Sequence, residues 1–469
     1  MKKSLKIIRI IAFALLVALV VVVTYNVLAW KDTNGNYVST TKQLYATGDN
    51  LMDVVFVGSS HCYCGIYPSE LWNEHGVASF DMATSGQDRN SSYYYVRELL
   101  KTQKPKVVVV DIYSLSFERP DDIGNDYRNY LSMKPSLNSI QMVLNYSLSK
   151  EEKSDFLARF PIIHTRYREL DTFDFDYFIP NEFQRGEAYG NVVSSRSLNR
   201  EVLNSTETGE LPETTKEWID KFMKLAEDEG FDLKFVLIPY EANLHDQIAY
   251  NTVGEYVISK GGSYTDFNKL IDEIGINEAT DFIDSGHLNA NGAIKLTDYI
   301  YNSMLSPYNL ADHRGDDKYY QWDLNSEYMR HQKAEKLLVD YQDRMFDVTT
   351  LASLNQVYTI INLDGDFTDA NENYFEMLQV FGMDYDSFAQ GGTWIYYEGT
   401  LTKVCNMEVG SEEYFMNLGR NDILRVGYYD LYEPSNLMLN KSCCLNGMGH
   451  LNIVAYDEMT EKIMFGKIY

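Results

Sequence analysis

The sequence predicts a three-layer α/β protein, in which helices cover a parallel sheet, followed by a smaller α+β domain. Between 51 and 310, short β-branched runs alternate with segments of helical periodicity, which is typical of a parallel sheet. After 346, several short strand-like runs surround a single helical segment. With 469 residues, 45% of them hydrophobic, the chain is long enough for two or three domains.

Residues 1–30 are expected to form a cytoplasmic basic tip and a transmembrane anchor. Lys2, Lys3, Lys6 and Arg9 precede 10–30, a run of 21 residues without charge that matches the roughly 30 Å hydrocarbon core. The basic flank predicts a single-pass plasma membrane protein with a cytoplasmic N-terminus and the rest outside. Small residues at 27–29 also fit a cleavable signal peptide, which would export the chain as well. We interpret the polar segment 31–50 as a stalk.

The α/β domain is expected at 51–310. Its predicted strands lie at 53–58, 77–82, 106–113, 233–239 and 281–283. Its predicted helices lie at 69–75, 90–102, 214–229, 264–274 and 290–305. The aromatic and charged stretch 116–212 lacks this alternation, and we interpret it as a mostly helical insertion.

A helical connector at 311–345 leads to the C-terminal α+β domain, 346–469. The predicted strands of this domain lie at 357–363, 393–398, 423–429, 451–456 and 462–468, with a helix at 370–381. Its segment 364–369 has several Asp residues but lacks the Gly and Glu of an EF-hand, so Asp369 is expected to cap the following helix.

The composition excludes several classes of function. The chain has 41 Lys and Arg against 68 Asp and Glu, a net charge of −27, which argues against a nucleic-acid partner. Five cysteines are too few for a disulfide scaffold. The eight histidines show no metal-ligand spacing, so we expect neither a metal nor another cofactor.

A Ser, an Asp and a His lie where an open α/β sheet places its ligands. Gly58, Ser59 and Ser60 follow the first predicted strand, and Asp284 and His287 lie between the last strand and the last helix. Such an Asp can orient the imidazole, and the imidazole can take the proton of a serine hydroxyl. The G-x-S-x-G elbow is missing because no Gly follows Ser60 at the required position, which disfavours an ordinary α/β-hydrolase.

These residues resemble the motifs of the SGNH (GDSL-type) hydrolase superfamily. Gly58-Ser59-Ser60 is similar to its first block, with Ser60 as the nucleophile, and Asp284 to His287 to its last block. Gly86, after the second strand, matches the glycine of the second block. The resemblance implies a flavodoxin-like sheet, a Ser60–His287–Asp284 triad, and an oxyanion hole formed by the N–H groups of Ser60 and Gly86.

In the third block, this chain departs from the family pattern. Where relatives have Gly-x-Asn-Asp, this chain has Asp111 followed by Ile112, Tyr113 and Ser114, so one oxyanion donor is missing or supplied by another group. Asp111 is either a site carboxylate or, in our preferred interpretation, a cap of the following turn.

Three further residues are accessory candidates or alternatives. Ser59 is an alternative nucleophile. His61 is a candidate substrate-binding residue, although a single histidine in a loop is more often just a polar turn residue. Cys62 is expected to be a small buried residue rather than a nucleophile.

The anchor and the Gly-Ser-Ser block together resemble the membrane-anchored, extracytoplasmic branch of that superfamily. That branch includes proteins of lipoteichoic acid D-alanylation and of polysaccharide O-acetylation. The C-terminal domain resembles ILEI-type domains in its strands 393–398 and 451–456, which implies an accessory role in binding glycan or an extracellular partner.

We therefore expect a membrane-anchored, extracytoplasmic serine esterase or O-acyltransferase that acts on an envelope or secreted polysaccharide through an acyl-Ser60 intermediate. A transferase with one membrane helix needs a multi-spanning partner, and the resemblance implies a membrane-bound O-acyltransferase. The alternative is a non-catalytic SGNH-like surface protein that binds glycan or supports such an acyltransferase.

Overall fold

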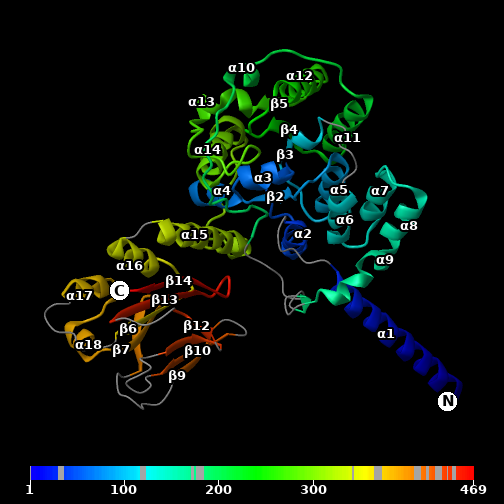
Figure 1. The fold of residues 1–469 in the computed structure, drawn as a ribbon. Coiled ribbons are helices and arrows are strands. Elements are labelled where there is room, and N and C mark those ends of the chain that lie inside the picture. Colours follow the sequence, from blue (N-terminus) through cyan, green and yellow to red (C-terminus); the bar gives the residue numbers. More distant parts are fainter. Residues whose placement is uncertain are drawn as a thin grey trace. The chain divides into compact units, whose positions relative to one another are not determined.

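The computed structural model describes residues 2–29, 36–116, 123–170, 174–175, 184–340, 343–363, 372–405, 414–418, 422–427, 436–440, 442–445 and 450–469. The chain divides into two compact units, Met1–Ser326 and Glu327–Tyr469 (Figure 1). The boundary between them falls within one helix, α15 (Tyr320–Asp340), in the predicted connector.

The first unit contains a five-stranded parallel sheet. Its strands are β1 (Val54–Gly58), β2 (Ser79–Ala83), β3 (Val107–Asp111), β4 (Asp232–Leu237) and β5 (Ser263–Asp266). Their order is β2-β1-β3-β4-β5, which is the doubly wound, flavodoxin-like order. Strands β1, β2 and β3 are buried throughout, as expected for parallel strands covered on both faces, and β1 and β3 are rich in valine. The predicted strands at 53–58, 77–82, 106–113 and 233–239 correspond to β1 to β4.

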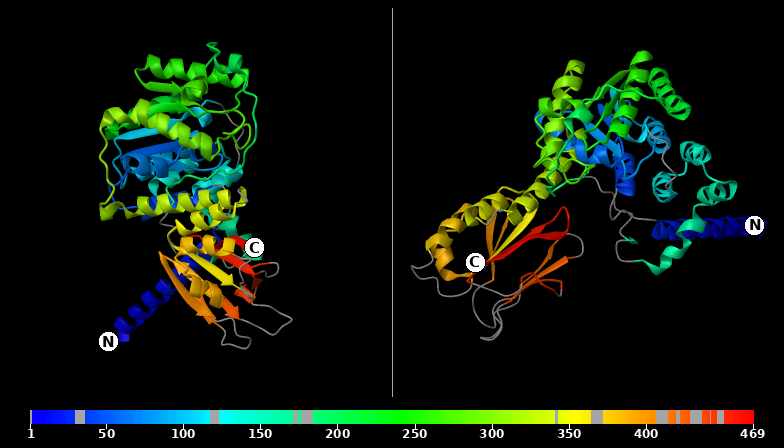
Figure 2. Two further views of the ribbon diagram at one scale, coloured as in Figure 1. Left: turned by 90° about the vertical axis from the view of Figure 1, so that its left-hand side faces the viewer. Right: turned by 45° about the horizontal axis from the view of Figure 1, so that its top comes forward.

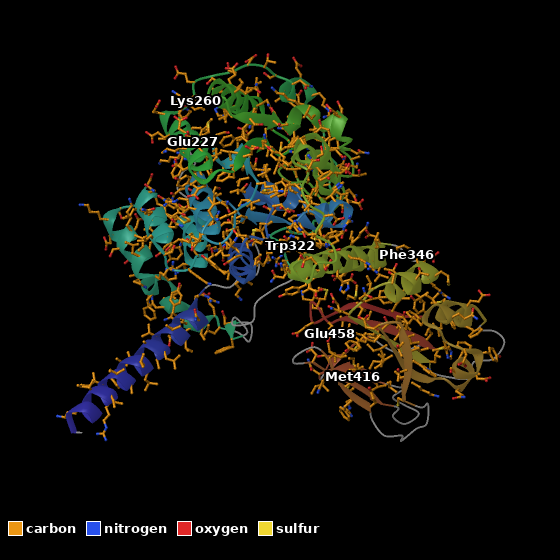
Figure 3. All side chains as sticks on the ribbon, turned by 180° about the vertical axis from the view of Figure 1, so that it is seen from behind. Glu227, Lys260, Trp322, Phe346, Met416 and Glu458 are labelled. Carbon is orange, nitrogen blue, oxygen red and sulfur yellow. The ribbon has the colours of Figure 1, made fainter. Side chains whose placement is uncertain are left out.

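Helices lie on both sides of this sheet (Figure 2). The main ones are α3 (Ser60–Gly65), α4 (Pro68–His75), α5 (Arg89–Leu99), α11 (Glu213–Glu229), α12 (Leu244–Ser259) and α14 (Ala290–Ile300). Helix α14 packs on α3 and α4, and α11 packs on α5. Trp322, labelled in Figure 3, is fully buried in this unit and donates from Nε1 to the Ser79 carbonyl oxygen.

The prediction for 264–274 and 281–283 was wrong in part. The fifth strand is β5, and the helical part after it is limited to a 3-10 turn (Phe267–Leu270) and α13 (Ile271–Ile274). Asp266 ends the strand because its side chain accepts a hydrogen bond from the Asn268 N–H and so starts the turn. Segment 281–283 contributes one isolated bridge, Phe282 to Leu288, and does not join the sheet.

The stalk predicted at 31–50 is also corrected. Helix α2 (Tyr37–Ala46) is largely buried and packs on β2 and on α6 (Ile123–Ser132). Its polar side chains tolerate burial because they find partners; for example, the Thr41 hydroxyl donates to the Ser132 carbonyl oxygen. Residues 30–35 lie outside the described ranges.

The predicted insertion at 116–212 is helical in its first half. It contains α6, α7 (Leu137–Asn145), α8 (Lys150–Ala158), α9 (Phe160–Ile163) and a 3-10 segment (His164–Arg168), with α10 (Arg200–Leu203) near its end. Residues 184–199 form no helix. The segment begins beside β2, where the Asp81 N–H donates to the Arg185 carbonyl oxygen, and continues beside 278–282, where the Ser194 N–H donates to the Phe282 carbonyl oxygen. Gly186 is required there, because a Cβ would lie 1.8 Å from the Asp81 carbonyl oxygen.

Helix α1 (Lys2–Leu28) is long and apolar enough to cross a membrane, and no other helix in the described ranges is. Its C-terminal end is fixed to the first unit. Leu28 and Ala29 are buried, and the Arg166 guanidinium donates to both of their carbonyl oxygens. A cation at this end also complements the helix dipole.

The second unit has two antiparallel sheets and several helices. One sheet has the order β14-β13-β6-β7-β8, and the other β12-β11-β10-β9. The strands are β6 (Val357–Leu363), β7 (Gly392–Tyr397), β8 (Thr400–Cys405), β9 (Tyr414–Leu418), β10 (Asp422–Gly427), β11 (Asn436–Leu439), β12 (Ser442–Cys443), β13 (Leu451–Asp457) and β14 (Lys462–Ile468). The helices are α16 (Arg344–Ala352), α17 (Glu372–Leu378) with a 3-10 turn (Gln379–Phe381), and α18 (Tyr385–Gln390).

Alternating side chains of the larger sheet form two cores. Ile361 and Ile453 pack with the helical residues Val348 and Leu351. Their neighbours Ile360 and Val454, together with Ile395, pack instead with the smaller sheet. This two-residue alternation makes the second unit a layer of helices and two layers of strands. The predicted strands at 357–363, 393–398, 423–429, 451–456 and 462–468 correspond to β6, β7, β10, β13 and β14, while 364–369 lies outside the described residues.

Candidate active site

Ser60 lies at the carboxyl edge of the parallel sheet. It is the first residue of α3 and follows the end of β1 by two residues. The turn needs Gly58, because a Cβ there would lie 2.9 Å from the Cβ atoms of both Asp111 and Cys62. The strand end therefore delivers the Ser60 hydroxyl to the edge where ligands bind in such sheets.

The structure brings Ser60, His287 and Asp284 together. His287 Nε2 lies 2.7 Å from Ser60 Oγ, and His287 Nδ1 lies 2.9 Å and 3.1 Å from the two carboxylate oxygens of Asp284. A carboxylate only accepts, so Nδ1 carries the proton and donates it to Asp284. The lone pair of Nε2 then faces the serine hydroxyl, which is the arrangement that a general base requires.

The loop that carries Asp284 and His287 is held by backbone contacts. The Gly286 N–H donates to Asp284 Oδ1 at 2.7 Å, and the Glu241 N–H donates to the Ser285 carbonyl oxygen at 2.9 Å. Burial alone would raise the pKa of Asp284, but the hydrogen bonds from Gly286 and His287 outweigh it and lower the pKa below its usual range. Asp284 is therefore a carboxylate at neutral pH.

Gly86 lies in the loop after β2, at the same edge as Ser60. Gly58 is paired with Ala83 across β1 and β2, so the chain reaches Gly86 three residues beyond the neighbouring strand end. Gly86 has a φ of +58°, and a Cβ there would lie 2.3 Å from the Asn125 side chain. Ser60 is the first residue of α3, and the N–H groups of a helix's first turn have no carbonyl partner within the helix.

Asp111 caps the turn after β3. Its Oδ1 accepts from the Tyr113 N–H at 3.2 Å, in agreement with our preferred interpretation. Asp111 is buried and lies beside Gly58. Tyr113, two residues after Asp111, is the next side chain of this turn that lies at the site, where its ring stacks on His61.

His61 is part of the wall of the site. Its ring is buried, stacks on Tyr113 at a centroid distance of 3.7 Å, and meets the rings of Tyr240 and His287 edge-on at 4.9 Å and 5.3 Å. The sequence singled out His61 as an accessory candidate but did not identify Tyr113 and Tyr240. Both follow the ends of β3 and β4 by two or three residues, and this position relative to the strand ends was the signal available.

Neither Ser59 nor Cys62 is placed as the nucleophile. The Ser59 hydroxyl is buried and has no hydrogen-bond partner among the described residues. The Cys62 thiol donates to Asp81 Oδ1 at 3.2 Å, and burial raises the pKa of both Cys62 and Asp81 well above their usual ranges. Cys62 is thus a protonated, buried thiol on α3, two residues after Ser60.

Neither metal-ligand clusters nor disulfides are found in the described part of the chain. No three His, Cys, Asp or Glu side chains there are grouped so that they could hold a metal ion. All five cysteines lie in described ranges, and they carry free thiols.

The chain has a distant likeness to a solved structure. No family model matches the chain, and no curated protein matches it. Among solved structures, the chain is similar to the crystal structure of a "putative acylhydrolase" from Bacteroides fragilis, with 12% sequence identity and a TM-score of 0.29. The match covers 58% of this chain and 95% of that chain.

Proposed function

We propose that this protein is a membrane-anchored, extracytoplasmic serine esterase or O-acyltransferase of the SGNH type. The observation that carries the proposal is the continuous chain of contacts from Ser60 Oγ through His287 to Asp284. A hydroxyl, a base and an oriented carboxylate in this order perform nucleophilic acyl transfer on several unrelated folds.

The reaction begins with attack of Ser60 Oγ on an ester carbonyl carbon, while His287 Nε2 takes the hydroxyl proton. The carbonyl oxygen becomes an oxyanion, which the N–H groups of Ser60 and Gly86 stabilise. The tetrahedral intermediate collapses as His287 returns the proton to the departing alkoxide oxygen. The alcohol leaves, and the acyl group stays on Ser60.

In the second half, His287 deprotonates the acceptor, which attacks the acyl-Ser60 ester. Transfer to water makes the protein an esterase, and transfer to a sugar hydroxyl makes it an acyltransferase. In either case the proton returns to Ser60 Oγ as the intermediate collapses, so the free triad is restored.

The proposed substrate is an acylated envelope or secreted polysaccharide. The anchor places the site on the side of the membrane where such polymers lie, if α1 spans the bilayer with its basic end inside. The partly exposed ring of Tyr113, which packs on the buried rings of His61 and Tyr240, is suited to contact with a sugar. A transferase would receive its acyl group from a membrane-bound O-acyltransferase, whereas an esterase would need no partner.

A second candidate function is a non-catalytic surface protein that binds glycan or supports a membrane acyltransferase. The absence of an Asn after β3 favours it, because one oxyanion donor is worth on the order of 10²–10³ in rate. The second unit, with its ILEI-like strand pattern, would then be the glycan- or partner-binding part.

Hydrolysis of 4-nitrophenyl acetate by the full chain in detergent micelles tests the proposal. We expect Ser60→Ala and His287→Ala to lower kcat/KM by at least about 10³-fold, because triad members act as a unit. Ser259→Ala, on the surface of α12, is the matched control and should keep the wild-type rate. A release rate that is the same in wild type and Ser60→Ala would favour the non-catalytic function. The assay is then repeated with an added sugar acceptor. Formation of acetylated sugar at the expense of free acetate would identify a transferase.

A further inference from the structure

A cavity of about 400 Å³ lies at the C-terminal end of α1, away from the triad. Its walls come from the last turn of α1, from α2, from the connection between α6 and α7, and from Arg159 between α8 and α9. The polar side chains that matter for its chemistry are Tyr25, Lys42, Tyr45, Lys134 and Arg159. None of the described residues that line it is acidic.

Arg159 is a buried guanidinium with incomplete partners. Its side chain is only 7% exposed, and its positive charge stacks 4.4 Å from the centre of the Tyr130 ring. Nε donates to the Tyr130 hydroxyl, and Nη1 donates to the Tyr25 hydroxyl at 3.2 Å and the Met133 carbonyl oxygen at 3.0 Å. Nη2 has no hydrogen-bond partner among the described residues, and the partners of Nε and Nη1 there are hydroxyl and carbonyl oxygens rather than carboxylates. A buried charge without an ion-pair partner is stabilised when an anion binds beside it.

Lys134 adds a second cation at the same cavity. It is exposed, its Nζ lies 4.1 Å from the centre of the Tyr45 ring, and its backbone N–H donates to the Tyr45 hydroxyl. The nearby carboxylate, Glu98, accepts from Tyr45 but is already bound by Lys101 at 2.6 Å and by Asn138 at 2.9 Å. The cavity therefore stays cationic in a chain whose net charge is −27.

The position of the cavity along α1 indicates the source of the anion. The apolar span of α1 is Lys6–Leu28, and Tyr25 lies in its last turn. If α1 crosses the bilayer, this end is at the level of the lipid headgroups, where Tyr is enriched. The contacts of Arg166 with Leu28 and Ala29 hold the cavity at that level.

We propose that this cavity binds the phosphate of an anionic phospholipid headgroup in the outer leaflet, with Arg159 and Lys134 as its ligands. The inference goes beyond the proposed activity and rests on α1 spanning the membrane. A headgroup held between the end of α1 and the insertion would fix the orientation of the first unit on the membrane surface.

Native mass spectrometry of the full chain in detergent, with added phosphatidylglycerol or phosphatidylcholine, tests this site. We expect one phosphatidylglycerol to be retained in strong preference to phosphatidylcholine. Lys134→Gln should lower that retention about fivefold, the effect expected for one cation near an anionic lipid surface. Arg159→Gln should lower it at least as much. Lys224→Gln, which removes an exposed lysine of α11, should not change it.

Lys134 is exposed, so its variant decides the question even if Arg159→Gln fails to fold. Equal retention of the two lipids, or retention of phosphatidylglycerol that neither variant lowers, would overturn the proposal. Binding of inorganic phosphate is measured as a third comparison. If phosphate occupies the site and phosphatidylglycerol shows no preference over phosphatidylcholine, the cavity is a site for a free anion and the lipid assignment is wrong.

Discussion

Single residues decide whether the Ser60 hydroxyl is a nucleophile. Asp284 holds His287 through Nδ1, and this contact fixes the tautomer that leaves Nε2 free to take a proton. The lowered pKa of Asp284 keeps it ionised at neutral pH, so in the proposed mechanism it would stabilise the imidazolium that forms during attack.

Asp284→Asn should lower kcat/KM for an acetyl ester by on the order of 10⁴, because an amide can hold the wrong imidazole tautomer without changing the shape of the loop. Steady-state kinetics of the full chain checks this. Asp228→Asn, at an exposed position of α11, is the control. A loss for Asp284→Asn no larger than that of the control would show that the carboxylate does not orient His287.

The sequence pointed to Ser60 because the end of β1 can be read from a β-branched run. It pointed to Asp284 and His287 through their spacing, since the strand predicted before them, 281–283, does not join the sheet. Tyr113 and Tyr240 were missed, since an aromatic residue after a strand is common and its stacking depends on where another loop lies. The preference for Asp111 as a cap was correct because a short-range contact, Oδ1 to the N–H two residues on, can be predicted locally.

Among the connections between strands and helices, the turn from β1 to α3 leaves no room for a Cβ at Gly58. Gly58→Ala would press a methyl group against the Cβ atoms of Asp111 and Cys62 and displace Ser60 from His287. We expect kcat/KM to fall by about 10²-fold, the effect of a misplacement near 1 Å. Gly209→Ala, where a Cβ meets only ordinary contact at 3.4 Å, is the control. Equal activity of the two variants would show that this turn does not position the serine.

In the second unit, α15 is tied to β13 by a buried histidine. His331 Nδ1 lies 2.9 Å from Asp457 and Nε2 lies 3.2 Å from Glu327. Burial lowers the pKa of His331, but the two carboxylates outweigh it and raise the pKa to about 9. Since the folded-state pKa is above the unfolded value, this stabilisation is complete below pH 6.5 and is lost as the pH rises through 9.

His331→Gln should destabilise the second unit at pH 6 by about 3–5 kcal/mol, because two carboxylates lose their cation. The difference from wild type should shrink between pH 6.5 and 9. Hydrogen exchange of β13 peptides, compared between wild type and variant at each pH, measures this difference in stability. A difference that stays constant over this pH range would mean that His331 is not charged in the folded protein.

Strands with apolar runs could be predicted from the sequence, whereas β5 could not. The four residues of β5, Ser263–Asp266, are each partly exposed, and three of them carry hydroxyl groups, so they lack the pattern of a buried strand. Helix α2 was missed for a related reason. Its buried Thr and Gln side chains are satisfied by distant partners, and those partners cannot be read from the sequence.

For the chain as a whole, the contacts at the end of α1 favour a retained helix over a cleaved signal peptide. Leu28 and Ala29 are buried against the first unit, and the Arg166 that binds their carbonyl oxygens is itself paired with Asp174. Cleavage after Ala29 would remove the helix that these groups hold. We therefore expect the intact mass of the protein from isolated membranes to include residues 1–29. A mature chain that begins near residue 30 would identify α1 as a signal peptide.

The central claim is that Ser60 is an activated nucleophile, and labelling with a fluorophosphonate probe tests it most directly. The full chain in native membranes and in detergent is treated with the probe and read by intact mass. The account predicts one adduct on wild type and none on Ser60→Ala or His287→Ala. Ser59→Ala should also give one adduct, because the Ser59 hydroxyl does not contact His287. An adduct that persists in Ser60→Ala, or no adduct on wild type in either preparation, would contradict it.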